Sequence, residues 1–248
     1  MPFIPERRRG VEILDDPSVD PRVRRRSMDD IVASNRWLGG RRAAWAALDD
    51  VIRECAASAD TKRLTMLDVG TGLADIPEHA RLVARRLGVT LTTIGVDRAH
   101  SVLSEAGSRL DERVTSDAMA LPLANGSVDI AMCSQTLHHF EHDEAVALVR
   151  ELDRVASQRV IVVDLRRSWI AAAGFKAAAI AMGFSRVTHH DGVTSVLRGF
   201  TPRELAGIIE EATGARALVR QHLGYRLTAT FLSSRRRDAA PRSHPAGA

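Results

Sequence analysis

The sequence of 248 residues has little cysteine, few aromatic residues and almost no lysine. Its two cysteines, Cys55 and Cys133, lie far apart, which excludes a disulfide framework or a zinc site and fits a reducing, cytoplasmic setting. No apolar run reaches the roughly 18 residues of a membrane span, so we expect no transmembrane segment. Aromatic residues make up only 4% and rarely alternate with arginines, which argues against a stacking surface for nucleic acid.

The positive charge of the chain comes almost wholly from arginine, since Lys62 and Lys176 are the only lysines. A net charge of +4 makes nucleic acid a partner to consider. Acids alternate with the arginines, however, as in "RELDR", and this pattern is typical of solvated helix faces. We therefore expect no nucleic-acid partner. Apolar residues make up 45%, enough for the core of one α/β domain.

The distribution of apolar, polar and helix-capping residues divides the chain into three parts. Residues 1–60 predict an N-terminal arm and a helical cap, with Ser27 as the N-cap of the first long helix. Residues 61–234 alternate short apolar segments with helical ones and predict the main domain. Residues 235–248, "RRRDAAPRSHPAGA", are polar and rich in alanine and proline, and they predict a disordered tail.

The main domain is expected to be a mostly parallel sheet with helices on both faces, because its strands are short, apolar and separated by helices. Only "HLGY" separates the last two strands, so they predict a hairpin and an antiparallel last strand. Residues 166–200 form an insertion after the fifth strand, at the carboxyl edge where such sheets bind ligands. The expected strands cover 64–69, 90–96, 113–116, 128–134, 159–164, 216–221 and 226–232.

The loop after the first strand predicts which ligand the sheet binds. In "LDVGTGLADIP", Gly70, Thr71 and Gly72 begin like a dinucleotide fingerprint, but its sixth position is Asp75. An aspartate there repels a pyrophosphate by roughly a kcal/mol or more, and Asp68 adds a second negative charge. No Lys-Ser or Lys-Thr follows the glycines, which excludes a Walker loop. The loop therefore favours a cationic nucleoside with an ammonium and a sulfonium group, S-adenosylmethionine.

Two further acids stand at the ends of the next strands. Asp97 ends the second strand in "TTIGVD", where it can accept both ribose hydroxyls. Asp117 follows the third strand, where it can accept the adenine amino group. A single acid of this kind is usually a strand-end cap. Three acids at successive strand ends, behind a Gly-x-Gly loop, instead indicate a cofactor site.

The segments "LDVGTGLADIP", "GVD" and "DAMALPLANGSVDIAMCSQTLHHF" closely resemble class I S-adenosylmethionine-dependent methyltransferases, especially small-molecule O-methyltransferases and quinone-biosynthesis enzymes. The resemblance covers residues 64–232 and implies a Rossmann-like fold with a seven-stranded sheet and a reversed last strand. Ala74 replaces a glycine common in this family, which is tolerable if the turn keeps φ negative. Besides the residues named above, the resemblance implies that the cofactor contacts Arg98, Ala118, Met119, Ser134 and Gln135.

Histidines in two segments are candidates for the base that deprotonates a methyl acceptor. His138 and His139 in "LHHF" follow the fourth strand, and His190 in "THHDG" has Asp191 beside it to orient the ring. An imidazole near a phenol of pKa about 10 assists transfer by removing its proton. Which histidine acts is open, and so is a packing or capping role for each.

The insertion and its flanks offer candidates for acceptor binding. Arg167 binds an acidic group of the acceptor or makes a structural ion pair. The stretch "WIAAAGFKAAAIAMGF", which begins at Trp169, forms a hydrophobic acceptor pocket, packs on its neighbours or contacts a second copy in a homodimer. No metal site is expected, because no Asp-Asn pair ends the fifth strand as in metal-dependent catechol O-methyltransferases.

These observations predict an S-adenosylmethionine-dependent methyltransferase that O-methylates a hydrophobic phenol, a quinone-like compound or a polyketide-like small molecule. C-methylation of a quinone precursor remains an alternative, because both reactions use the same cofactor site. Nucleic-acid methylation is disfavoured, since "SQTLHHF" replaces the Asn-Pro-Pro-aromatic motif that grips a flipped base. A cofactor-binding regulator without catalysis is the third alternative.

Overall fold

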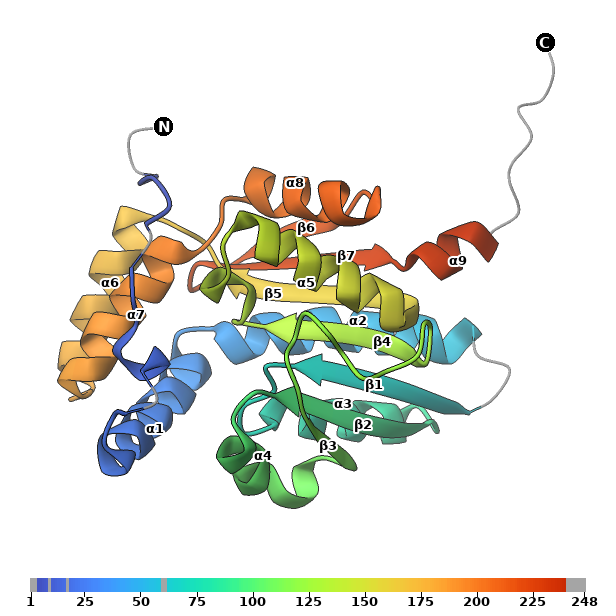
Figure 1. Cartoon of the computed structure of the whole chain (residues 1–248), viewed down its shortest axis with the longest axis horizontal. Helices are drawn as coiled ribbons and strands as arrows, with labels where there is room; N and C mark the ends of the chain where they lie inside the picture. Colours follow the sequence, from blue (N-terminus) through green and yellow to red (C-terminus); the bar gives the residue numbers. More distant parts are fainter. Residues whose placement is uncertain (1–3, 9, 17, 59–61, 240–248) are drawn as a thin grey trace, which may run out of the picture.

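The computed structural model describes residues 4–8, 10–16, 18–58 and 62–239, and Figure 1 shows their central sheet between two layers of helices. The seven-stranded sheet has the order β3-β2-β1-β4-β5-β7-β6. Its first five strands pair in parallel, whereas β7 is antiparallel to both β5 and β6. The strands are β1 (Arg63–Val69), β2 (Thr90–Asp97), β3 (Glu112–Thr115), β4 (Val128–Ser134), β5 (Ala156–Leu165), β6 (Leu218–His222) and β7 (Arg226–Leu232).

The predicted fold class is confirmed, including the reversed last strand. The expected hairpin joins β6 to β7, and Gly224 and Tyr225 take positive φ angles of 76° and 56° in its turn. The helices are α1 (Pro21–Trp37), α2 (Gly40–Ser58), α3 (Asp75–Arg86), α4 (His100–Ala106), α5 (His142–Val155), α6 (Trp169–Ala181), α7 (Arg186–Arg198), α8 (Pro202–Thr213) and α9 (Ser234–Ala239). Three short 3₁₀ turns are η1 (Ile13–Asp15), η2 (Gly107–Arg109) and η3 (Leu137–His139).

Each face of the sheet has its own buried core. On one face, α5 and α8 pack on the strands through side chains such as Val149 and Leu205. On the other face, α2 and α3 do so through side chains such as Ile52 and Val83. Because both faces are covered, the central strands are mostly apolar, and most of their charged residues lie at or near the strand ends.

The expectations for the two chain ends are wrong in part. Helix α1 begins at Pro21, because the Asp20 carboxylate accepts hydrogen bonds from the backbone N of Arg22 and Val23 and proline suits the first helical position. Ser27, the expected N-cap, instead lies in the interior of α1 and is buried. At the other end, the expected tail is helical through Ala239 in α9, and residues 240–248 lie outside the described residues.

The insertion after β5 forms α6 and α7, which pack against each other. The Asp30 carboxylate of α1 accepts hydrogen bonds from Ser185 N at 2.8 Å and Thr188 Oγ1 at 2.9 Å, so α1 is tied to the start of α7. Figure 1 shows α1, α6, α7 and the N-terminal segment together at the end of the sheet toward which the arrows of β1, β4 and β5 point. These elements therefore enclose the carboxyl edge of the sheet, where the sequence predicts the ligand site.

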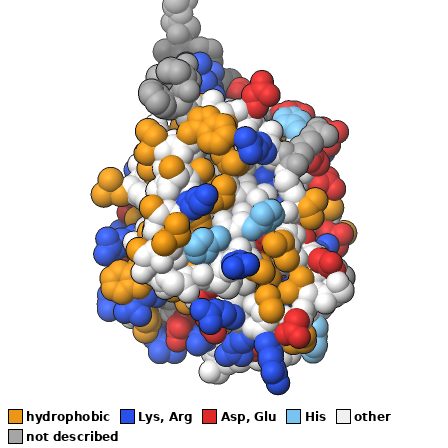
Figure 2. Space-filling view, turned by 90° about the vertical axis from the view of Figure 1, so that its left-hand side faces the viewer, with side chains coloured by type: hydrophobic (Ala, Val, Ile, Leu, Met, Phe, Trp, Pro, Cys, Tyr) orange, Lys and Arg blue, Asp and Glu red, His pale blue; other side chains and the backbone are white. Residues whose placement is uncertain are grey.

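The outer surface of this end mixes hydrophobic and basic side chains (Figure 2). Two large apolar residues are well exposed, Trp37 of α1 at 68% and Ile180 of α6 at 62%. No helix in the described part of the chain is both long and apolar enough to cross a membrane.

Candidate active site

The loop between β1 and α3 turns on residues with left-handed backbone conformations. Gly70 has a φ of 71°, and a Cβ built on it would lie 2.3 Å from Thr136 Oγ1, so only glycine fits. Ala74 has a φ of 59°, so the negative φ that would make an alanine easily tolerable here is absent. Helix α3 begins directly after Ala74, so the free N–H groups of its first turn lie beside the loop. A left-handed alanine costs about 1–2 kcal/mol, which the surrounding packing offsets.

Asp68 lies under this loop and is 1% exposed. Its Oδ2 accepts a hydrogen bond from Thr71 Oγ1 at 2.9 Å, whereas its Oδ1 has no partner in the described part of the chain. Burial raises the pKa of Asp68 to about 7, and the nearby Asp75 and Asp97 add to the rise. Burial likewise raises the pKa of Asp75. A cation placed here would satisfy the unpaired oxygen and stabilise the carboxylate charge.

The acids at the ends of β2 and β3 are held by the backbone. Asp97 accepts hydrogen bonds from Gly72 N at 3.3 Å and Ala99 N at 2.9 Å, which joins the first loop to the end of β2. Asp117 accepts one from Met119 N at 2.9 Å. One cavity of about 710 Å³ brings together every residue predicted for the cofactor: Asp68, Gly70, Thr71, Gly72, Asp75, Asp97, Arg98, Asp117, Ala118, Met119, Ser134 and Gln135.

His138, at the wall of the same cavity, is fixed by a buried carboxylate. Its Nδ1 lies 2.7 Å from Asp164 Oδ1, and its backbone N donates to Asp164 Oδ2 at 3.0 Å. Burial alone would raise the pKa of Asp164, but His138 and the backbone N–H groups of Leu165 and His138 hold it below its ordinary value. Because an ionised carboxylate accepts hydrogen bonds, we assign a proton to Nδ1, which leaves Nε2 as an acceptor.

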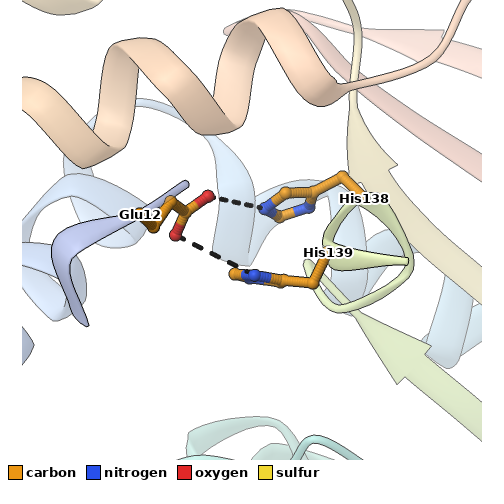
Figure 3. Close-up of side chains that lie close together, drawn as sticks. All are labelled: Glu12, His138 and His139. Carbon is orange, nitrogen blue, oxygen red and sulfur yellow. Dashed lines mark ion pairs between the residues drawn. The ribbon is translucent and has the colours of Figure 1, made fainter. Parts of the chain in front are cut away.

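Glu12 from the N-terminal segment completes a cluster with the two histidines of η3 (Figure 3). Its carboxylate oxygens lie 3.9 Å from His138 Nε2 and 3.9 Å from His139 Nδ1. Burial raises the pKa of Glu12, and Ser195 Oγ donates to its Oε1 at 2.7 Å. Burial lowers the pKa of His139 to about 3, with His138 and Arg198 adding to the shift, so His139 is neutral at physiological pH.

The donor atoms of Glu12, His138 and His139 all lie within 4.8 Å of one another, close enough in principle to ligate one metal ion. This set was not expected from the sequence. Arg198 argues against a cation there, because its Nη1 already lies 3.6 Å from the Glu12 carboxylate. We therefore interpret the cluster as a set of proton-handling and hydrogen-bonding groups.

Three residues predicted for the acceptor lie outside the cavity. His190 is half exposed on α7, with its Nδ1 2.9 Å from Asp191 Oδ1. Arg167 is buried and engaged with Pro5 O, Gly199 O and, at 2.6 Å, Glu204 Oε1, so it is structural. Trp169 is 43% exposed, and the Arg8 guanidinium stacks over its ring. These three predictions are corrected accordingly.

Asp191 does line the cavity, but its carboxylate holds the N-terminal segment in place. It accepts hydrogen bonds from Ile13 N at 2.8 Å and Leu14 N at 3.0 Å. The helices of the insertion thus bring Glu12 to the histidines. Glu12 gave no signal in the sequence, because its segment has no periodic pattern. Asp164 could have been predicted, because it is an acid at the carboxyl end of a strand, like Asp68 and Asp97.

Comparisons with known proteins bear on the domain and the fold. Residues 67–164 match the family described as a methyltransferase domain. The plantazolicin methyltransferase BpumL, in complex with SAH, is similar in structure with a TM-score of 0.63 and 12% identity over 87% of this chain and 91% of that one. Magnesium protoporphyrin IX methyltransferase (ChlM) from Synechocystis PCC 6803 has a TM-score of 0.52 and 16% identity over 79% and 85%. At such identities the likeness concerns the fold. None of the curated proteins matches the sequence.

Proposed function

We propose that this chain, a class I S-adenosylmethionine-dependent methyltransferase by its matched domain and its fold, methylates a hydroxyl of an aromatic or polyketide-like small molecule. The observation that carries the proposal is the buried His138–Asp164 pair at the wall of the cavity lined by the predicted cofactor residues. Asp68 would face the positively charged methionine end of the cofactor. Asp97 and Asp117 would receive its ribose and its adenine.

His138 is the proposed general base. With its Nδ1 proton held by Asp164, the Nε2 lone pair is free to take a proton from the acceptor hydroxyl. Bound S-adenosylmethionine would supply the methyl group, and the electron pair of its carbon–sulfur bond would stay on sulfur. The acceptor would thus become a methyl ether, the cofactor would leave as S-adenosylhomocysteine, and His138 would hold the proton. Alignment within the cavity supplies much of the remaining acceleration.

His139 has a different proposed role. With a pKa of about 3 it is a weak base, so it serves better as a neutral hydrogen-bonding group for the acceptor. Its ring lies tilted against that of His138, with 4.3 Å between the ring centroids. In this proposal His138 accepts the proton and His139 orients the acceptor.

The nature of the acceptor is inferred from the apolar part of the cavity wall. Apolar side chains from four separate segments of the chain line it, and they suit an aromatic or polyketide-like ring system better than a highly charged one. Those side chains are Leu14, Met28, Ile31, Phe140 and Phe175. C-methylation of a quinone precursor would use the same base and the same pocket.

The test is turnover of S-adenosylmethionine with a panel of phenols, measured as formation of S-adenosylhomocysteine, with NMR of the product. We expect a new O-methyl carbon signal. H138A should lower kcat about 10²- to 10⁴-fold while retaining affinity for S-adenosylhomocysteine. The matched control is H190A, because His190 also pairs with an aspartate but lies outside the cavity. Unchanged kcat in H138A would refute the base, and a C-methyl signal would select the alternative reaction.

A further inference from the structure

Arg226, the first residue of β7, is a buried cation without a counter-ion. It is 5% exposed and lines the cavity. Its Nη1 donates to Gly224 O at 2.8 Å, but its Nε has no partner, and no carboxylate of the described residues lies within ion-pair distance. Arg167 is equally buried, yet it has Glu204 and two carbonyl oxygens. The fold thus provides an ion-pair and hydrogen-bond partners for the Arg167 guanidinium, but it leaves the Nε donor of Arg226 unpaired.

An unpaired buried charge is unfavourable for the ligand-free protein. Burial lowers the pKa of Arg226 to about 10, and Asp164 opposes the shift, so the side chain remains protonated at neutral pH. Buried charges in proteins are normally paired or hydrogen-bonded at every donor. A free donor on a protonated arginine that faces a cavity indicates that the missing partner is an anionic part of a ligand.

The guanidinium lies at the edge of the sheet where the cavity opens. Because β7 is antiparallel, Arg226 lies opposite Leu165 at the carboxyl edge of the sheet, next to the residue that holds His138. A Cβ built on Gly40 would lie 2.9 Å from Asn35 Oδ1, 3.2 Å from Gln135 Nε2 and 3.3 Å from Arg226 Nε, so these three side chains converge where only a glycine fits. All three residues also line the cavity. Arginine and amide donors that line one cavity suit the two oxygens of a carboxylate.

We propose that Arg226, together with Gln135, binds a carboxylate of a ligand in this cavity. The proposal deepens the proposed function and rests on the same cavity. Two ligands can supply this group: the methionine part of the cofactor carries a carboxylate, and so does an acidic acceptor such as a hydroxybenzoate. Arg226 is a binding residue in either case, and it takes the place that the sequence assigned to Arg167.

The experiment is calorimetry on the full chain with wild type, R226M, R226K and the control R220M, which removes an exposed arginine from the neighbouring strand. The probes form matched pairs with and without a carboxylate. S-adenosylhomocysteine is compared with 5′-methylthioadenosine, which lacks the amino-acid part. In the presence of S-adenosylhomocysteine, 4-hydroxybenzoate is compared with its methyl ester.

We expect R226M to lose about tenfold or more in affinity for the carboxylate member of one pair and nothing for its counterpart. Loss on S-adenosylhomocysteine identifies the cofactor as the source, and loss on 4-hydroxybenzoate identifies the acceptor. R226K should recover part of the loss, and R220M should bind like wild type. The melting temperature of ligand-free R226M should equal or exceed that of wild type, because an unpaired charge is removed.

Three results would overturn the proposal. The first is that R226M binds both S-adenosylhomocysteine and 4-hydroxybenzoate as tightly as wild type does. Unchanged affinity for S-adenosylhomocysteine, with no binding of 4-hydroxybenzoate to either protein, counts as the same result. Another is an equal loss on both members of a pair. The third is a lower melting temperature or failure to fold of ligand-free R226M, which would make the guanidinium structural. These readouts are binding and melting, so they are independent of the turnover of H138A that tests the proposed function.

Discussion

Affinity for S-adenosylhomocysteine should depend on pH through Asp68, whose carboxylate is buried with one oxygen unpaired. Its pKa in the ligand-free fold is about 7 instead of 3.8, mainly because of burial. Since the folded pKa lies above the unfolded one, the carboxylate charge destabilises the ligand-free fold. The penalty is absent below pH 3.8, grows as the pH rises and is complete above pH 7, where it amounts to about 4 kcal/mol.

A ligand with an ammonium group reverses this penalty, because it favours the ionised carboxylate. With a pKa of about 7, roughly nine-tenths of Asp68 is ionised at pH 8 and roughly one-tenth at pH 6. If the cofactor product binds the ionised form, its affinity should fall about tenfold from pH 8 to pH 6. Binding at pH 7 should release about half a proton per site.

Calorimetry at pH 6, 7 and 8, in buffers of different ionisation enthalpy, measures both the affinity and the proton release. D68N should bind more weakly at pH 8 and show no dependence on pH, and its ligand-free form should gain stability against urea at that pH. D117N is the control, because Asp117 also lines the cavity but is assigned to the adenine, so the slope should persist. Equal affinity at pH 6 and pH 8, or a slope that survives in D68N, would refute the reasoning.

Three further predictions concern other parts of the site. G70A should lose about 2–4 kcal/mol of unfolding free energy in urea and lose cofactor binding, because residue 70 has a positive φ and its Cβ would clash with Thr136. The control is G174A in α6, where a Cβ would meet open space, and it should be neutral or stabilising. D191N should speed limited proteolysis of the N-terminal segment, whose backbone Asp191 holds, and equal rates with wild type would contradict this. Excess EDTA should leave turnover unchanged, and loss of activity that a divalent ion restores would make the Glu12 cluster a metal site.

The fold and the cofactor end were predictable from the sequence because they repeat one local signal. Each parallel strand ends at the same edge of the sheet, so Asp68, Asp97 and Asp117 had to converge wherever the helices between them packed. The glycines of the first loop marked where the backbone turns. Strand periodicity and the short turn before β7 gave the antiparallel last strand.

The acceptor end was predicted less well because its residues meet only through tertiary contacts. Glu12 and His138 are far apart in sequence, and the segment that carries Glu12 has neither helical nor strand periodicity. His190 and Asp191 are adjacent in the sequence and do pair, but the helix they share turns the imidazole outward. The start of α1 was misplaced because Ser27 was predicted as its N-cap, whereas Asp20 caps the helix and Pro21 is its first residue.

Asp68 and Asp164 show why burial alone does not tell a binding group from a positioning group. Both are buried aspartates near the ends of strands in one sheet. Asp164 accepts hydrogen bonds from His138 Nδ1, His138 N and Leu165 N, and these donors hold its pKa below the ordinary value. Asp68 accepts one from Thr71, and its pKa is raised. The fold therefore provides the hydrogen-bond partners of the first carboxylate, which can orient a base, whereas the second keeps an oxygen that a bound cation would pair with. The same distinction separates Arg167 from Arg226, so unpaired buried charges mark the two positions at which we propose that ligand groups bind.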